Sequence, residues 1–123
     1  MTARIFFSGI VVFFVMAYCT YLSVVSDFFV HLSWWDDPIH ILGGVWAGLI
    51  ASWFLIRVEE SPSVMQCVGF ALFAGLAVEI FEYYSGIGRS LFMSYPLDTA
   101  KDFAMDIIGG YLAWWYVRFL QKV

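Results

Sequence analysis

Charged side chains are scarce in this chain of 123 residues: they make up 13% of the sequence, and lysine and arginine together number 6. Soluble domains average about 25% charged residues, so the composition excludes an ordinary soluble domain. No run of lysine or arginine is present to follow a phosphate backbone, and the formal net charge is −4. Nucleic-acid binding is therefore excluded as well.

Apolar residues dominate instead, with 63% of the chain hydrophobic and 21% aromatic. They form runs close to the roughly 20 residues that a helix needs to cross a bilayer. A chain this short cannot close a barrel, and lipid tolerates no open sheet edge, so each run is predicted to be a helix. We therefore predict an all-α membrane protein with a single domain, residues 1–123, and four transmembrane helices over residues 5–25, 38–56, 64–84 and 98–120.

The first run follows Arg4, as the apolar part of a signal peptide follows its basic flank. The stretch Ala17-Tyr18-Cys19 lacks the small residues that an export protease needs, so we expect the run to stay in the protein. Residues 26–35, which include His31, are predicted to form a short interfacial segment before the second span.

Local signals predict where the later helices begin and end. Asp37 before Pro38 is expected to be the N-cap of the second span with the proline as first helical residue, and Ser61-Pro62-Ser63 is expected to do the same for the third. Ser85-Gly86 is expected to end the third span. Small residues such as Gly44 and Gly75 are spaced so that helices can approach closely, and we interpret them as packing residues.

The orientation is predicted from the basic residues. One face of a four-span hairpin carries Arg4, Arg57, Arg118 and Lys122, and the other carries Arg89 and Lys101. Because cytoplasmic loops hold the excess of lysine and arginine, both termini are predicted to be cytoplasmic.

Acidic residues are distributed unevenly over this topology. The outer half holds eight of them: Asp27, Asp36, Asp37, Glu79, Glu82, Asp98, Asp102 and Asp106. Against two bases this leaves a balance of −6, whereas the inner half has four bases against Glu59 and Glu60, or +2, and the two add to the formal −4.

The spacing of these acids predicts a common site. Asp37 with His40, and Glu79 with Glu82, are three residues apart, so each pair shares a helix face. The aspartates 98, 102 and 106 are four apart and form a stripe that descends about 12 Å. We predict that three antiparallel spans present these groups at one depth and that the metal ligands are Asp37, His40, Glu79, Glu82, Asp98, Asp102 and Asp106.

Ionised carboxylates near hydrocarbon are costly, and two bases cannot neutralise so many. The acids must therefore share protons or bind one or two divalent metal ions. An oxygen-rich site with a single imidazole favours Mg²⁺, Mn²⁺ or Ca²⁺ over Zn²⁺ or iron. Paired ligands on neighbouring helices are also typical of carboxylate sites inside helix bundles, which often hold two metals.

Simpler roles compete with metal binding at several positions: an N-cap for Asp37 or Asp98, a cap or a solvated group for Asp36, and a headgroup-region side chain for Glu82. The two outer bases can be counter-ions to the acids or can hold an anionic group such as a lipid phosphate. The remaining acids lie among apolar neighbours, where a purely structural role explains them least well.

The motifs D-D-P-I-H-I-L-G-G, E-I-F-E and D-T-A-K-D-F-A-M-D-I-I-G-G resemble those of the VanZ-like and YjdF-like small bacterial membrane proteins, over roughly residues 34–115. The matching positions are Asp37, His40, Glu79, Glu82, Asp102, Asp106 and Gly109. VanZ-like chains tend to have asparagine where this chain has Asp106, so the YjdF-like proteins fit better. The resemblance implies a polytopic protein of the bacterial inner membrane whose activity is poorly defined.

Three functions fit these observations. The first is a metal-dependent enzyme acting on a lipid headgroup or an isoprenoid phosphate, with Glu79 and Asp102 as catalytic residues and Arg89 binding the substrate. The second is an accessory or structural subunit with a stabilising metal site, and the third is a carrier in which the acids relay cations or protons. The expected partners are the lipid bilayer, a lipid-phosphate substrate and further copies of the chain.

Overall fold

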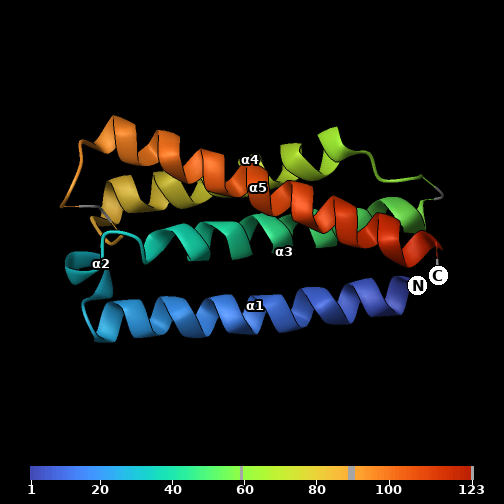
Figure 1. Cartoon of the computed structure of the whole chain (residues 1–123), viewed down its shortest axis with the longest axis horizontal. Coiled ribbons are helices and arrows are strands. Elements are labelled where there is room, and N and C mark those ends of the chain that lie inside the picture. Colours follow the sequence, from blue (N-terminus) through green and yellow to red (C-terminus); the bar gives the residue numbers. More distant parts are fainter. Residues whose placement is uncertain (59, 89–90, 123) are drawn as a thin grey trace.

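The computed structural model describes residues 1–58, 60–88 and 91–122, and within them it contains only helices and connecting segments (Figure 1). The helices are α1 (Thr2–Val25), α2 (Phe28–His31), α3 (Asp36–Arg57), α4 (Val64–Ser85) and α5 (Tyr95–Lys122). Three of them, α1, α3 and α4, are long and apolar enough to cross a membrane. The chain is therefore an integral membrane protein built from helices, as its composition predicts.

The ends of α4 follow the local signals in the sequence. Ser63 is the N-cap, and its hydroxyl accepts a hydrogen bond from the backbone N–H of Gln66, whose side chain accepts one from the backbone N–H of Ser63 in return. At the other end Gly86 adopts a φ of 73°, a left-handed conformation that glycine reaches without strain. The predicted range of this helix, residues 64–84, and its end at Gly86 are confirmed, but the prediction that Ser61 caps it ahead of Pro62 is wrong, because the N-cap is Ser63.

The start of α3 differs from the prediction. The helix begins at Asp36 with Trp35 as its N-cap residue, so the prediction that Asp37 is the N-cap is wrong. The indole N–H of Trp35 donates a hydrogen bond to the hydroxyl of Ser23, 2.5 Å away, which ties the start of α3 to the end of α1. The short helix α2 lies between them, at the place of the predicted interfacial segment.

The start of α5 also lies earlier than predicted, at Tyr95. Pro96 occupies the first turn, where a proline costs no helical hydrogen bond. Asp98 consequently lies inside the first turn, and its interpretation as an N-cap is wrong.

Helix α3 is central to the packing, because it contacts α1, α4 and α5, and α4 in turn contacts α5 (Figure 1). The backbones of α3 and α5 approach closely at two glycines: a Cβ atom on Gly44 would lie 2.5 Å from the carbonyl oxygen of Asp106 and 3.1 Å from the Cα of Gly109. This approach brings the start of α3 against the first half of α5.

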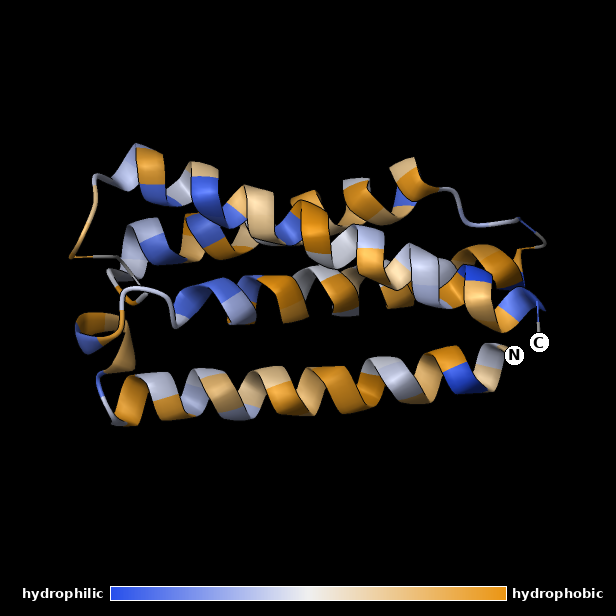
Figure 2. Ribbon diagram, in the orientation of Figure 1, coloured by the Kyte–Doolittle hydropathy of each residue, from blue (hydrophilic) through white to orange (hydrophobic). Residues whose placement is uncertain are grey.

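The two ends of the bundle differ in polarity (Figure 2). The apolar core of Ile5, Leu49, Ala113 and Val117 lies toward the end where both termini are found. Hydrophilic residues gather at the opposite end of α3, α4 and α5. Large apolar side chains such as Phe14 and Phe73 are exposed along the outside, as expected for helices whose surroundings are lipid.

Candidate metal centre

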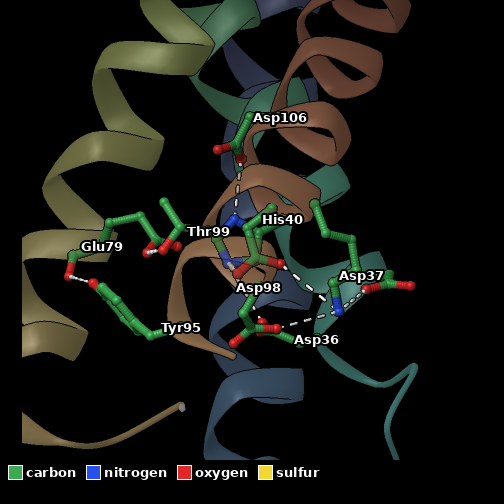
Figure 3. A network of polar contacts seen from close by, with 10 residues as sticks. Asp36, Asp37, His40, Glu79, Tyr95, Asp98, Thr99 and Asp106 are labelled. Atoms are coloured by element: carbon green, nitrogen blue, oxygen red, sulfur yellow. Dashed lines mark hydrogen bonds and ion pairs between the residues drawn. The ribbon is translucent and has the colours of Figure 1, made fainter. Parts of the chain in front are cut away.

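The polar end of the bundle encloses a set of ionisable side chains that we call the acidic cluster: Asp36, Asp37, Glu79, Glu82, Asp98, Asp102 and Asp106, together with His40 and Lys101. Except for Asp37 and Lys101, every member is buried. Figure 3 shows side chains from α3, α4 and α5 pointing toward one another here. The prediction that carboxyl groups of three helices come together is therefore confirmed for these residues, and their common depth in the membrane stays a prediction.

His40 lies at the centre of the cluster. Its Nδ1 is 3.2 Å from an oxygen of Asp106, at hydrogen-bonding distance. Its Nε2 is 3.6 Å from Asp36 and 3.8 Å from Asp102. One imidazole thus contacts three carboxyl groups, one from its own helix and two from α5 (Figure 3).

Lys101 supplies the positive charge on the other side of the cluster. Its ammonium group is 2.8 Å from Asp37, 3.6 Å from Asp98 and 3.9 Å from Asp102. The interpretation of Lys101 as a counter-ion is confirmed. Arg89, for which the sequence leaves the same role or a substrate-binding role open, lies outside the described residues.

Glu79 of α4 is held by two side chains of α5 that the sequence analysis did not single out. The hydroxyl of Thr99 donates a hydrogen bond to its Oε2 at 2.6 Å, and the hydroxyl of Tyr95 donates one to its backbone carbonyl at 3.2 Å. A signal for them exists, because positions 95, 99, 102 and 106 follow one face of a helix.

Several buried carboxylate oxygens have no hydrogen-bond partner among the described residues. They include both oxygens of Asp102, Oδ2 of Asp106 and Oε1 of Glu79. The side chain of Asp102 belongs to a residue that is 0% exposed, so water does not solvate it. An ionised carboxylate in this position is destabilising unless a proton or a cation compensates it. Lys101 lies near Asp102 but makes no hydrogen bond to it, so these oxygens can still accept a proton or a further cation.

Two groups of side chains bring their ligand atoms within 4.8 Å of one another, as a metal ion requires. The first ligand group is Asp36, His40 and Glu82, and the second ligand group is His40, Glu79 and Asp102. The buried acids and the histidine can therefore hold a metal ion. Since His40 belongs to both groups, the two positions are adjacent.

The predicted ligands divide accordingly. His40, Glu79, Glu82 and Asp102 belong to the two groups, and Asp36 joins them as a ligand that the sequence analysis left out. Its interpretation as a helix cap or a solvated side chain is wrong, because it is inside the helix and 8% exposed. The other predicted ligands surround the groups: Asp106 contacts His40, and Asp37 and Asp98 contact Lys101.

No family model matches the chain, and neither a curated protein nor a solved structure matches it. The chemistry of the acidic cluster is therefore the basis for a functional proposal.

Proposed function

We propose that the chain is a four-span protein of the bacterial inner membrane that holds one or two divalent metal ions in its acidic cluster and uses them in a reaction on a lipid headgroup or an isoprenoid phosphate. The observation that carries the proposal is the state of Asp102. Both of its oxygens are buried without a hydrogen bond. Oδ2 lies 3.8 Å from the imidazole of His40, and Oδ1 lies 3.9 Å from the ammonium of Lys101. A cation bound between these helices would satisfy them.

The donor set favours a hard cation. Carboxylate oxygens outnumber the one imidazole in each ligand group, and such sites suit Mg²⁺, Mn²⁺ or Ca²⁺. Asp106 would act on the metal through His40, because its carboxylate contacts the imidazole and fixes the orientation of the ring.

The two ligand groups suggest different roles for their members, metal binding in the first and proton transfer in the second. A metal ion held by Asp36, His40 and Glu82 would polarise a phosphoryl oxygen or activate water. Glu79 and Asp102 would then be available as general bases. Thr99 holds one oxygen of Glu79, which leaves the buried Oε1 as the atom that accepts a proton.

We also propose that the chain belongs with the VanZ-like and YjdF-like membrane proteins. The positions that carry this resemblance include His40, Glu82 and Asp102, and these same side chains converge in the acidic cluster. Their convergence supports a common site in place of a chance similarity of apolar helices.

A stabilising metal site in an accessory subunit is the second candidate. It is favoured by the way the ligand groups join α3, α4 and α5, since an ion shared by three helices stabilises their packing. Both candidates require a bound metal, and they differ in whether substrate reaches it.

The test is elemental analysis of the purified protein before and after treatment with a chelator, with Mg²⁺ or Mn²⁺ supplied beforehand. We expect one or two divalent ions per chain, and the double change Asp36→Asn with Asp102→Asn, which alters one carboxylate in each ligand group, should lower that content by more than half. The matched control is Asp27→Asn, because Asp27 is an exposed acid at the same end of the bundle. Its left-handed backbone also suits asparagine.

A wild-type protein that binds no ion would overturn the proposal, and so would a double variant, Asp36→Asn with Asp102→Asn, that keeps the full metal content. A phosphatase assay on lipid phosphates separates the two candidates, because only the enzyme releases phosphate with the metal present.

A further inference from the structure

An apolar groove leads from the bilayer side of the protein to the first ligand group. It encloses a cavity of about 570 Å³ between α1, α3 and α4. Met16, Trp46 and Phe73 are among the apolar side chains that line it. At its polar end it is closed by Asp36, His40, Glu82 and Asp106.

The length of the groove matches a lipid chain. Along α3 it extends from Asp36 to Ile50, which at about 1.5 Å per residue is about 21 Å. One leaflet contributes roughly 15 Å, half of the hydrocarbon core. A hydrocarbon chain that fills this groove from the acidic cluster therefore extends through one leaflet and a little past the middle of the membrane.

The groove is open to lipid along its side. Phe70, Phe73 and Phe81 of α4 line it and are 48%, 73% and 57% exposed. Gly43 lies at the floor of the groove, where it has no side chain to fill the space. A Cβ atom on Gly43 would contact only the sulfur of Met16, at 3.6 Å. An occupant can thus enter from the bilayer without passing through water.

The polar end of the groove determines which headgroup fits. Among the described residues that line it there is no lysine or arginine, and the acids Asp36, Glu82 and Asp106 repel an anion when no metal ion is bound. With a metal ion on the first ligand group, however, three protein ligands leave positions open, because such ions take six or more. Phosphate oxygens can fill these positions, whereas an ammonium headgroup has no free electron pair to donate.

We propose that this groove binds the hydrocarbon chain of a lipid phosphate and delivers its phosphate to the metal ion held by Asp36, His40 and Glu82. The inference rests on the metal centre proposed above and specifies its substrate. The shared chemistry is a terminal phosphate on a hydrocarbon chain, which an isoprenoid phosphate and phosphatidic acid both have.

The experiment measures binding of dodecyl phosphate to the purified, Mn²⁺-loaded protein by native mass spectrometry, with dodecylammonium as the competing headgroup. Farnesyl phosphate and phosphatidic acid are compared in parallel to identify the source of the phosphate. We expect dodecyl phosphate to bind to the metal-loaded protein. Its affinity should fall at least tenfold when a chelator removes the metal. The cationic amphiphile should bind less tightly to the loaded protein.

The groove is tested with Ala77→Phe, which places a ring beside the chain without changing a polar residue, since Ala77 is exposed and lines the groove. The matched control is Ala104→Phe, the same change at an exposed alanine of α5 that does not line it. We expect the first variant to bind dodecyl phosphate at least tenfold more weakly and to keep its metal, and the control to behave as the wild type. Gly43→Leu, which fills the floor, is a second blocking variant.

Metal content is measured on the same samples, so the two proposals fail separately. Wild-type protein without metal overturns the metal centre and this inference with it. Three results with metal-loaded protein would overturn this inference alone. Dodecyl phosphate does not bind, dodecylammonium binds more tightly than dodecyl phosphate, or both blocking variants bind dodecyl phosphate as tightly as the wild type does.

Discussion

Lys101 occupies the acidic cluster as a cation that belongs to the protein itself. Its ammonium group contacts Asp37, Asp98 and Asp102, the last of which is also in the second ligand group. A divalent ion near Asp102 would therefore be repelled by Lys101, and we expect the lysine to weaken metal binding while it stabilises the metal-free protein. At an effective dielectric constant of about 20, unit charges 4 Å apart interact by about 4 kcal/mol, so the effect is measurable.

We expect Lys101→Met, which keeps an apolar stem of similar length, to tighten Mn²⁺ binding about tenfold, or about 1.4 kcal/mol. The same change should lower the thermal midpoint of the metal-free protein, because three carboxyl groups lose their cation. Isothermal titration and thermal unfolding in detergent measure the two effects. Lys122→Met at the exposed end of α5 is the control and should change neither. Weaker metal binding in Lys101→Met would mean that the lysine helps to assemble the site.

The roles of Asp36 and Asp37 show what single positions in a sequence leave open. Both precede Pro38 near the predicted start of a helix, and moving that start by one residue changes which of them points inward. The helix begins at Asp36, and that residue contacts His40 one turn later, whereas Asp37 turns to Lys101. The acidic character of this site was predictable from composition and spacing, but the phase of the helix depends on how Trp35 packs against Ser23.

Helices α4 and α5 meet where Gly75 faces Asp106. A Cβ atom on Gly75 would collide with the carboxylate of Asp106, which is buried and contacts His40. Gly75 therefore makes room for the side chain that orients the central imidazole. Small residues that let membrane helices approach closely are common, but here the space is filled by a carboxyl group and not by backbone.

We expect Gly75→Ala to destabilise the protein by about 1–3 kcal/mol through overpacking and to reduce its metal content. Gly69→Ala is the matched control, since a Cβ there meets nothing within 4 Å and alanine favours a helix by about 1 kcal/mol. Thermal unfolding in detergent and elemental analysis provide the measurements. The double variant Gly75→Ala with Asp106→Ala should lose less stability than the two single changes together. Strict additivity would show that the two residues do not interact.

How well a helix end could be predicted depended on whether its signal is local. The capping box at Ser63 and the left-handed Gly86 involve only residues close in sequence, and both limits of α4 were predictable. The start of α5 lies three residues before the predicted position, Asp98, and its local signal is Pro96, which a helix tolerates in its first turn. The partners of Glu79 on α5 could not be predicted, since they depend on how two helices are rotated against each other.

The number of membrane spans depends on helix α5. It is 28 residues long, about 42 Å, and so exceeds the roughly 30 Å of the hydrocarbon core. It is not among the helices that are apolar enough to span by composition, and its first half carries the charged residues of the acidic cluster. Asp102 and Asp106 face His40 of α3, and Asp106 also faces Gly75 of α4, whereas Ile108, Leu112 and Phe119 are exposed on the outside of the helix. A helix that buries its charges against its neighbours can cross lipid despite a low mean hydropathy.

We therefore expect α5 to be the fourth span, with both chain ends on the cytoplasmic side, consistent with their position at one end of the bundle (Figure 1). The test uses a membrane-impermeant maleimide on intact cells, in a background where Cys19 and Cys67 are alanine. Ser85→Cys at the end of α4 should be labelled from outside. Ser61→Cys, at the other end of α4, and Gln121→Cys, near the end of α5, should react only after the cells are opened. If Gln121→Cys is labelled together with Ser85→Cys, α5 does not cross, and the acidic cluster would have to be placed at a membrane surface.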